Sequence, residues 1–547
     1  MEMCVDDLTS LPLRCVTREE WVANTPQYSA IIEDETNWHS IPLFNYILSE
    51  NVKNQQLIRF RGMIQNMQNP EYFMSKYEVV NTVTGVSTVH SGKLRDSVTC
   101  QDNEKLIEDS QHSVCESRDT WLCIPIPALN NWVSCSWKKP YMKRHLGRSE
   151  EDDPQKRAIS IMQSSDQSSG QTSNFLHLNA SETHCRTCCL KLYDVDTSSF
   201  VVNDVIEVAG FLSLPEIIDE IEDQELTVHN AKLPRLHVVA CKKLQHSSLL
   251  PLLSLNPVAD FTTSRNDLHF IFSQLLLGDK LAADYLVCHL LSSIYSRTDM
   301  MALGQLPLNI INIPKYNLIK NIYSAIEQLV MKSLFLPLTL ENLNRRRFNP
   351  KKNYETEQLS EGLLQLSPHT HLVLDETQMQ PGKLEAPGVV NMTALRKLVL
   401  EQKVAYDFEY YQLDFNCDIP VLVFSEGKSL IPCPIVIPLR PDAVCLENVP
   451  DIFQAAHNYL QPVLQRLRAY ILCVQSAKCD INSEMQQIIQ NDFVKLRQDS
   501  NFNASAEDLH NLIVLARLQA LSVGETILTA STWEKTVNLE MQRKQRL

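Results

Sequence analysis

The chain has 547 residues, of which 44% are hydrophobic and 21% charged, and its formal net charge is −15. Only 13 residues are glycine, and no two of them have the spacing of the G-x-G-x-x-G, G-x-x-x-x-G-K-[ST] or G-x-S-x-G motifs. Because such loops need glycine to turn tightly or to approach a phosphate, a conventional nucleotide-hydrolysing enzyme or α/β-hydrolase is not expected. The negative charge also argues against an autonomous binder of the nucleic-acid backbone.

The N-terminal segment carries Asp6 and Asp7 where a secretory signal would have a basic region and an apolar run. The 16 cysteines lie at irregular spacing, and no stretch reaches 18 uncharged apolar residues. These features predict a reduced, intracellular protein without a membrane span. Residues 1–56 are expected to form a helical or irregular lead-in.

Short alternating runs rich in β-branched and aromatic residues begin at Leu57, as in LIRFRGMIQNM, and return after residue 184, as in VNDVIEVAGFLS. This alternating pattern predicts β-strands. Residues 57–137 and 185–245 are therefore interpreted as one small β-barrel that is split by an insertion. In the insertion, residues 138–184, serine, glutamine and charge dominate, which predicts disorder.

A basic cluster lies at the start of the insertion and comprises Lys138, Lys139, Lys143, Arg144 and Arg148. An exposed basic run is typical of a nuclear-import signal. A solvated linker that alternates basic and acidic runs is the other interpretation, and the sequence does not decide between them.

From residue 262 to 450 apolar strands and amphipathic helices alternate, which predicts a layered α/β domain. Strands are expected at 306–313, 371–377 and 418–427, with helices at 317–334 and 356–366. Residues 451–547 are expected to be helical. One of these helices should begin at the N-cap Ser505, with Asp508 three positions later, and end at Gly524.

Two groups of metal-ligand residue types were considered. HCRTCC at 184–189 contains one C-x-x-C, but no second pair at a matching spacing follows, so ordinary buried thiols are favoured. His369 and His371 are two positions apart without an evident carboxylate partner, and we expect exposed residues at the start of a strand.

LVLDET at 372–377 is the most enzyme-like signal, because an apolar strand ends in Asp375 and Glu376. In nucleotide-hydrolysing proteins such a pair holds magnesium and positions water opposite a phosphate loop. The nearest candidate loop, around Gly278 and Lys280, lacks the second glycine and the Lys-Ser/Thr pair. Hydrolysis is therefore not expected.

Several long stretches resemble the minichromosome maintenance (MCM) complex-binding protein family, from about residue 57 to the C-terminus. They are listed here: IRFRGMIQNMQNPEYFMSKYE, VNDVIEVAGFLS, LPRLHVVACKKLQH, LLLGDKLAADYLVCHLLSSIYSR, GLLQLSPHTHLVLDET, LEAPGVVNMTAL, KVAYDFEYYQLDF and EDLHNLIVLARLQALSVGETILTASTWEKTVNLE.

The resemblance implies a nuclear, non-enzymatic partner of the replicative helicase subunits, without a cofactor or metal and associated with chromatin only through those partners. It would stand in for one subunit, promote assembly or unloading of the helicase in S phase, and support replication and sister-chromatid cohesion. The implied fold is an oligonucleotide-binding (OB)-like barrel, a degenerate AAA+-like α/β core and a C-terminal helical lid. Gly278 to Lys280 would then mark the lost phosphate loop, and Asp375 with Glu376 the former metal-binding strand end.

The alternative function is single-stranded nucleic-acid binding by the barrel. Tyr72, Phe73 and Tyr77 could stack on bases, and Arg59 and Arg61 could supply charge. Aromatic residues in the barrel core and the net negative charge favour the simpler interpretation, in which direct nucleic-acid binding is not expected.

Overall fold

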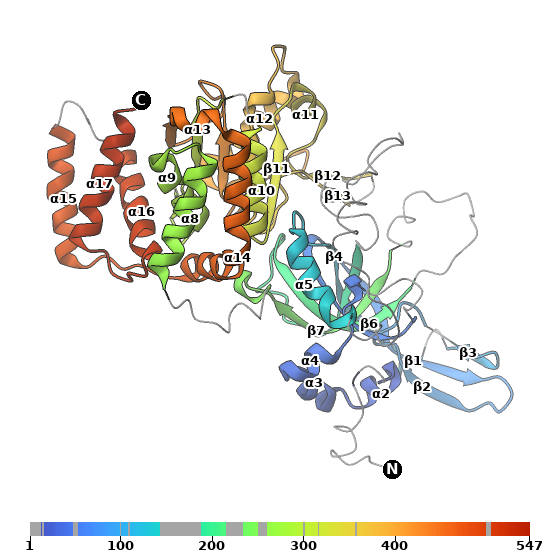
Figure 1. Cartoon of the computed structure of the whole chain (residues 1–547). Coiled ribbons are helices and arrows are strands. Elements are labelled where there is room, and N and C mark those ends of the chain that lie inside the picture. The colour runs from blue at the N-terminus through green and yellow to red at the C-terminus, as the bar shows by residue number, and fades with distance from the viewer. Residues whose placement is uncertain are drawn as a thin grey trace.

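The structure is a computed structural model. It describes residues 13, 16–46, 53–98, 100–107, 110–142, 187–214, 233–249, 260–298, 301–314, 317–355, 358–498 and 505–547. The architecture is a mixed α/β, multidomain one, with a β-sheet region at one end and a helix-covered α/β region at the other (Figure 1). The general fold class expected from the sequence is thus confirmed.

The N-terminal region combines short helices with one large, mostly antiparallel sheet. Its helices are α2 (Arg18–Ala23), α3 (Thr25–Glu33), α4 (Glu35–Ser40), η2 (Phe44–Tyr46), α5 (Asn131–Met142) and η5 (His246–Leu249). Its strands are β1 (Leu57–Asn81), β2 (Ser87–Ser91), β3 (Glu104–Leu106), β4 (Val114–Ile124), β5 (Cys188–Leu192), β6 (Val205–Ser213) and β7 (Arg235–Lys243).

Strand β1 is long, and different parts of it pair with different strands of this sheet. Its first half pairs with β6, and the following residues pair with β4. Since β4 also pairs with β5, β5 with β7 and β7 with β6, the pairings of these five strands form a closed ring around a buried apolar cluster. The far half of β1 pairs with β2 and β3 in an arm that reaches away from the body (Figure 1).

Helix α5 differs from the expected organisation. It includes residues 138–142, which were expected to belong to the disordered insertion. The rest of the insertion, residues 143–184, lies outside the described residues.

The second region is built on a five-stranded parallel sheet of order β11-β14-β17-β10-β18. Its strands, with those of two small neighbouring sheets, are β8 (Ser296–Arg297), β9 (Ala302–Leu303), β10 (Leu308–Ile311), β11 (Ser333–Pro337), β12 (Lys351–Asn353), β13 (Gln358–Ser360), β14 (His371–Asp375), β15 (Lys403–Asp407), β16 (Gln412–Asn416), β17 (Val421–Phe424) and β18 (Ile435–Pro438). The helices are α8 (Phe261–Leu275), α9 (Lys280–Leu291), α10 (Leu318–Leu329), α11 (Leu340–Arg345), η6 (Glu376–Gln378), α12 (Ala386–Glu401), α13 (Ala443–Glu447), α14 (Val449–Ser476), α15 (Ser483–Gln498), α16 (Ala506–Ser522) and α17 (Ala530–Lys544).

Both faces of the parallel sheet are buried. In β14, Val373 joins the apolar cluster formed with α8, α9, α10 and α14, whereas Leu372 and Leu374 join the opposite cluster formed with α11 and α12. Successive side chains of a strand point to opposite faces, so an all-apolar strand is the pattern expected for a sheet between two helical layers. The three strands predicted in this region are confirmed by β10, β14 and β17.

Two local predictions in this region are wrong. The segment 356–366 was expected to be a helix, but it contains the short strand β13 followed by irregular chain. The helix expected over 317–334 ends at Leu329, and the edge strand β11 begins at Ser333. Tertiary pairing with β14 overrides the helical pattern there.

Candidate functional site

Asp375 and Glu376 lie at the carboxyl end of β14, where ligands commonly bind in parallel sheets. The Asp375 carboxylate is buried and accepts hydrogen bonds from the backbone N–H of Thr377 at 3.0 Å and from its hydroxyl at 2.6 Å. Glu376 accepts a hydrogen bond from the backbone N–H of Leu430 at 3.2 Å. Both carboxylates are therefore engaged in internal hydrogen bonds, Asp375 with its own turn and Glu376 with the segment after β17.

Burial also affects the carboxyl group of Glu376. Burial raises the pKa of Glu376, and its hydrogen bonds with Ser429 and Leu430 only partly offset this effect. Among the described residues, no group of three or more His, Cys, Asp or Glu side chains is arranged to hold a metal ion.

Gly278 lies in the turn between helices α8 and α9, and Lys280 is the first residue of α9. Gly278 has a φ of +90°, and a Cβ there would lie 2.9 Å from the Cβ of Asp442. Asp279 caps α9, and its carboxylate also accepts the backbone N–H of Arg440 at 2.9 Å and the guanidinium of Arg546 at 2.6 Å. The turn is therefore a structural junction between α9 and the C-terminal segment.

Gly278 to Lys280 do not occupy the place that the resemblance assigned to them. A phosphate loop joins a sheet strand to a helix, whereas this turn joins two helices. The strand–loop–helix unit beside β17 is β10–α10, and its connection is residues 312–317, NIPKYN. That connection contains no glycine. Spacing of glycines alone gave no signal for this position.

The basic cluster falls mostly beyond the described residues. Lys138 and Lys139 lie in the last part of α5, where the side chains are not described. Lys143, Arg144 and Arg148 lie outside the described residues.

Arg59 and Arg61, which were considered as charge for nucleic-acid binding, are buried within the N-terminal region. Both guanidinium groups contact the carboxylate of Glu207, at 2.7 Å from Arg59 and 2.9 Å from Arg61, and only 3% of the Glu207 side chain is exposed. The indole N–H of Trp38 donates to the same carboxylate at 3.0 Å. These two arginines therefore neutralise a buried carboxylate and do not face a ligand.

The aromatic residues of the same alternative are dispersed. Tyr77 is buried, and Phe73 packs edge-on against Tyr193 with 5.1 Å between ring centroids. Tyr72 is exposed. One exposed ring does not make a stacking surface for successive bases, so this geometry does not favour the nucleic-acid alternative.

The cysteine and histidine predictions have different outcomes. Cys188 and Cys189 are buried in β5, where burial raises the pKa of both thiols, while Cys185 lies outside the described residues. His371 does begin β14, but it is buried, so the expectation that it is exposed is wrong. Tertiary packing against His289, with ring centroids 6.0 Å apart, accounts for the difference.

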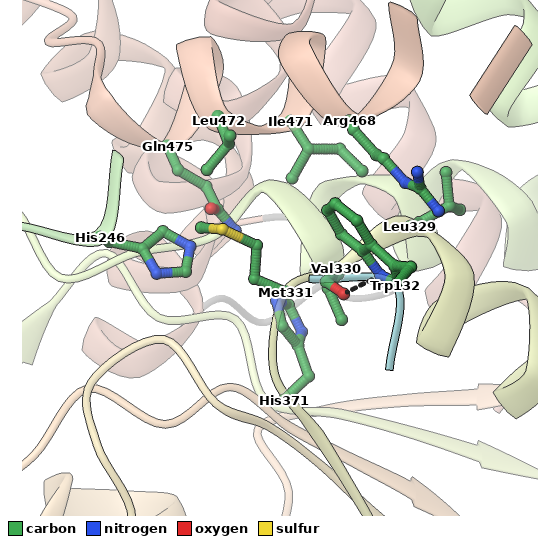
Figure 2. A pocket seen from close by; sticks show the side chains of 10 residues that line it. All are labelled: Trp132, His246, Leu329, Val330, Met331, His371, Arg468, Ile471, Leu472 and Gln475. Carbon is green, nitrogen blue, oxygen red and sulfur yellow. Dashed lines mark hydrogen bonds between the residues drawn. The ribbon is translucent and has the colours of Figure 1, made fainter. Parts of the chain in front are cut away.

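A small cavity lies where the two regions meet (Figure 2). It is lined by His246, His371 and Met331 on one side and by Arg468 and other residues of α14 on the other. About 10 Å³ is accessible to the centre of a water molecule, which is the space of a single water. A cavity of this size excludes a nucleotide or another organic cofactor at this position.

The start of α5 contributes Trp132 to the lining of this cavity. The guanidinium of Arg468 lies 3.6 Å from the ring centroid of Trp132, whose indole N–H donates to the carbonyls of Glu327 and Val330, each at 3.1 Å. The side-chain amide of Asn130 donates to the Val330 carbonyl at 2.8 Å. These residues join the two regions. No motif marked them, because their partners lie far away in the sequence.

Additional polar contacts extend this junction. The Gln65 side chain donates to the carbonyl of Leu359 at 2.9 Å, and the Gln365 side chain donates to the carbonyl of Gln65 at 2.9 Å. The Tyr406 hydroxyl contacts the side chain of Asn203 at 3.0 Å.

In the part of the chain that the structure describes, no helix is long and apolar enough to cross a bilayer.

The sequence is similar to known proteins along nearly its whole length. The family model described as "Mini-chromosome maintenance replisome factor" matches residues 28–174 and 148–547. A Drosophila melanogaster protein named mini-chromosome maintenance complex-binding protein is 33% identical, covering 100% of this chain and 98% of its own length. Proteins of the same name from Homo sapiens and Gallus gallus are 31% and 32% identical, covering 100% and 94% of this chain and 98% and 91% of their own lengths. The chain therefore belongs to the mini-chromosome maintenance replisome factor family.

Proposed function

We propose that this protein binds subunits of the mini-chromosome maintenance helicase as a non-enzymatic partner. The observation that carries the proposal is the match to relatives named as MCM complex-binding proteins along nearly their whole lengths. The described site supports a binding role over catalysis. Asp375 and Glu376 are engaged in internal hydrogen bonds, and the β10–α10 connection has no glycine for a phosphate loop.

The finer fold assignment is part of this proposal. The closed ring of β1, β4, β5, β7 and β6 supports an OB-like barrel. The parallel sheet covered by helices on both faces supports a degenerate AAA+-like core, and the helices α14 to α17 that follow it support a lid. An architecture shared with a helicase subunit would let the protein stand in for one of them.

A subunit mimic acts through its surface. A neighbour in a ring recognises shape and charge, neither of which requires a working ATP site. Because the mimic does not complete a hydrolytic site, it would cap or destabilise the ring. Promotion of helicase assembly or unloading in S phase follows from this mechanism, with consequences for replication and sister-chromatid cohesion and with association to chromatin through the helicase.

Co-purification tests the partnership. The tagged full chain is recovered from nuclear extract, and the bound proteins are identified by mass. We expect several helicase subunits in stoichiometric amounts. Recovery of none of them at physiological salt would remove the proposal.

ATP measurements test the non-enzymatic part separately. The purified chain is expected to show neither ATP turnover nor tight ATP binding, with a helicase subunit as the positive control. Substantial turnover or tight binding would leave the partnership intact but would overturn the mimic mechanism.

The proposed location is the nucleus, with the basic cluster as the import signal. Replacing Lys138, Lys139, Lys143, Arg144 and Arg148 by alanine should move a fluorescent fusion into the cytoplasm. Unchanged nuclear accumulation of this variant would assign import to another segment or to a partner.

A further inference from the structure

Three polar side chains line the small cavity where the two regions meet. They are His246 of η5, His371 at the start of β14 and Gln475 of α14. The Nδ1 atoms of both histidines and the Oε1 atom of the glutamine are buried, and none of them has a hydrogen-bond partner among the described residues. Figure 2 shows the two imidazole rings and the amide around the side chain of Met331. Three elements thus each bring one unpartnered polar atom to the same cavity.

The orientation of the Gln475 amide is set by its other end. Its Nε2 atom donates to the Leu290 carbonyl at 2.9 Å. The backbone carbonyl of Gln475 also accepts a hydrogen bond from the Ser293 hydroxyl at 3.1 Å, which holds this part of α14 in place. The Oε1 atom is therefore a fixed acceptor. Because a buried polar atom without a hydrogen bond is unfavourable, native structures usually supply a partner for it.

Both imidazole rings at the cavity are neutral at pH 7. Burial lowers the pKa of His246 and of His371 well below the ordinary histidine value. The neighbouring bases His369 and Lys332 disfavour a further positive charge on either ring, and only the Gln475 side chain opposes this effect at His246. In a neutral imidazole one nitrogen carries a proton and the other accepts one. Each Nδ1 atom can therefore act as a donor or as an acceptor, according to the tautomer.

The size and charge of the cavity select a small, neutral ligand. About 10 Å³ is accessible to the centre of a water molecule, which is too little for an organic molecule. Two buried cations of the junction already have partners. Lys332 donates to the Ser367 hydroxyl at 2.9 Å. Arg468 donates to the Gln328 carbonyl at 2.8 Å, and its guanidinium lies over the ring of Trp132. A water molecule therefore fits the site better than an anion does.

We propose that this cavity binds one ordered water molecule that bridges His246, His371 and Gln475. The water donates one hydrogen bond to Oε1 of Gln475 and one to Nδ1 of one histidine, and it accepts a hydrogen bond from the Nδ1–H of the other histidine. About three hydrogen bonds are usual for a buried water, and here they satisfy all three polar atoms. Because His246 belongs to the N-terminal region and the other two residues to the second region, the water links the two regions.

A high-resolution crystal structure of the full chain tests the site directly. We expect one water peak within about 2.7–3.2 Å of at least two of the three polar atoms. Crystals soaked in bromide should show no anomalous peak at this position. A bromide peak would assign the site to an anion and overturn the proposal, and so would a cavity without any peak.

Hydrogen exchange in solution tests the link with matched variants. The backbone amides of Asn130 and Ser333 both donate across the junction, so their exchange reports on its opening. Gln475→Met keeps the length of the side chain but removes the acceptor. Both amides should then exchange about fivefold faster, which is the effect of losing one ordinary hydrogen bond. Gln465→Met makes the same change at an exposed position of α14 and should exchange like the wild type.

A double variant separates one shared water from independent contacts. His246→Phe keeps an aromatic ring beside His369, whose ring centroid lies 4.5 Å away, but removes the Nδ1 atom. If His246 and Gln475 act through the same water, the double variant should exchange about as fast as the faster single variant. Accelerations that multiply to about 25-fold would mean independent contacts and would overturn the bridge. Equal exchange of Gln475→Met and Gln465→Met would overturn it as well.

Discussion

The carboxylate of Glu207 is the shared counter-charge of two buried guanidinium groups. Burial by itself would raise the pKa of Glu207, but Arg61 and Arg59 outweigh it, so the pKa lies below its ordinary value. The group is thus charged in the folded protein at neutral pH. Glu207 on β6 lies opposite Arg61 on β1. The ion cluster therefore spans the β1–β6 pairing, which closes the ring of five strands.

Replacing Glu207 by Gln keeps the shape of the side chain but removes its charge. Two buried arginines would remain without their counter-charge, which costs about 3–5 kcal/mol in comparable cases. We expect a matching loss in the free energy of unfolding, measured by urea denaturation. Glu534→Ala, at an exposed position of α17, is the control and should change stability little. Similar stability of both variants would contradict the role given to Glu207.

His289 is a buried base near the junction. Burial lowers the pKa of His289 to about 4, although the hydrogen bond to the Leu306 carbonyl opposes the shift. Burial also lowers the pKa of His371 and brings the pKa of Lys332 to about 7. The unfolded chain therefore takes up more protons than the folded one at mildly acidic pH.

The sign of the pH dependence follows from the depressed pKa of His289. Stability is lost as pH falls below the ordinary histidine pKa of about 6.5, and between pH 7 and 5 this one residue accounts for about 2 kcal/mol. His289→Asn can still donate a hydrogen bond but does not titrate, so its unfolding free energy should fall less over this range. His112→Asn, at an exposed position, should keep the wild-type slope. A slope unchanged by His289→Asn would refute the assignment.

At the scale of single elements, α16 begins with a complete capping box. The Ser505 hydroxyl accepts the Asp508 backbone N–H at 3.1 Å, and the Asp508 carboxylate accepts the Ser505 backbone N–H at 2.9 Å. The sequence prediction of this start is confirmed, as is the stop near Gly524, which has a φ of +85°. Local hydrogen bonding fixed both ends, which is why sequence alone located them.

Ser505→Ala should lower the free energy of unfolding by about 1 kcal/mol, because the first turn of α16 loses its side-chain cap. Thermal or urea unfolding of the full chain measures the change. Ser531→Ala, an exposed serine inside α17, should leave the midpoint nearly unchanged. An equal effect of both substitutions would argue against a specific cap.

At the scale of the whole molecule, the segment from Ala128 to Trp132 connects the two regions. The Asn130 backbone N–H donates to the Met331 carbonyl at 2.9 Å, and its side-chain oxygen accepts the Ser333 hydroxyl at 2.9 Å. Leu129 forms an isolated bridge with Lys332. Polar contacts of this kind, buried and satisfied, favour a fixed arrangement of the regions.

Asn130→Ala removes two side-chain hydrogen bonds at the junction, each worth about 1 kcal/mol. We expect the two regions to unfold in separate urea transitions when they are followed by fluorescence and by hydrogen exchange. The neighbouring exposed residue supplies the control, and Asn131→Ala should retain the wild-type transition. If Asn130→Ala unfolds as the wild type does, the junction does not couple the regions.

The sequence by itself determined features that depend on nearby residues. The glycine spacing showed that no glycine-based phosphate-loop motif is present, and apolar runs located β10, β14 and β17. The capping box located α16. In each case the residue pattern that carries the signal lies within a few neighbouring positions, so one window of sequence is enough to detect it.

Only the tertiary structure decided where distant residues meet. It placed Gly278 between two helices, paired Arg59 and Arg61 with Glu207, buried His371 and made β13 out of a segment with a helical pattern. Among the residues that the structure describes, it also paired β2 with β1 alone, although residues 79–92 showed only β-propensity in the sequence. Strand pairing and burial depend on partners far away in the chain, and local propensity is too weak to specify them.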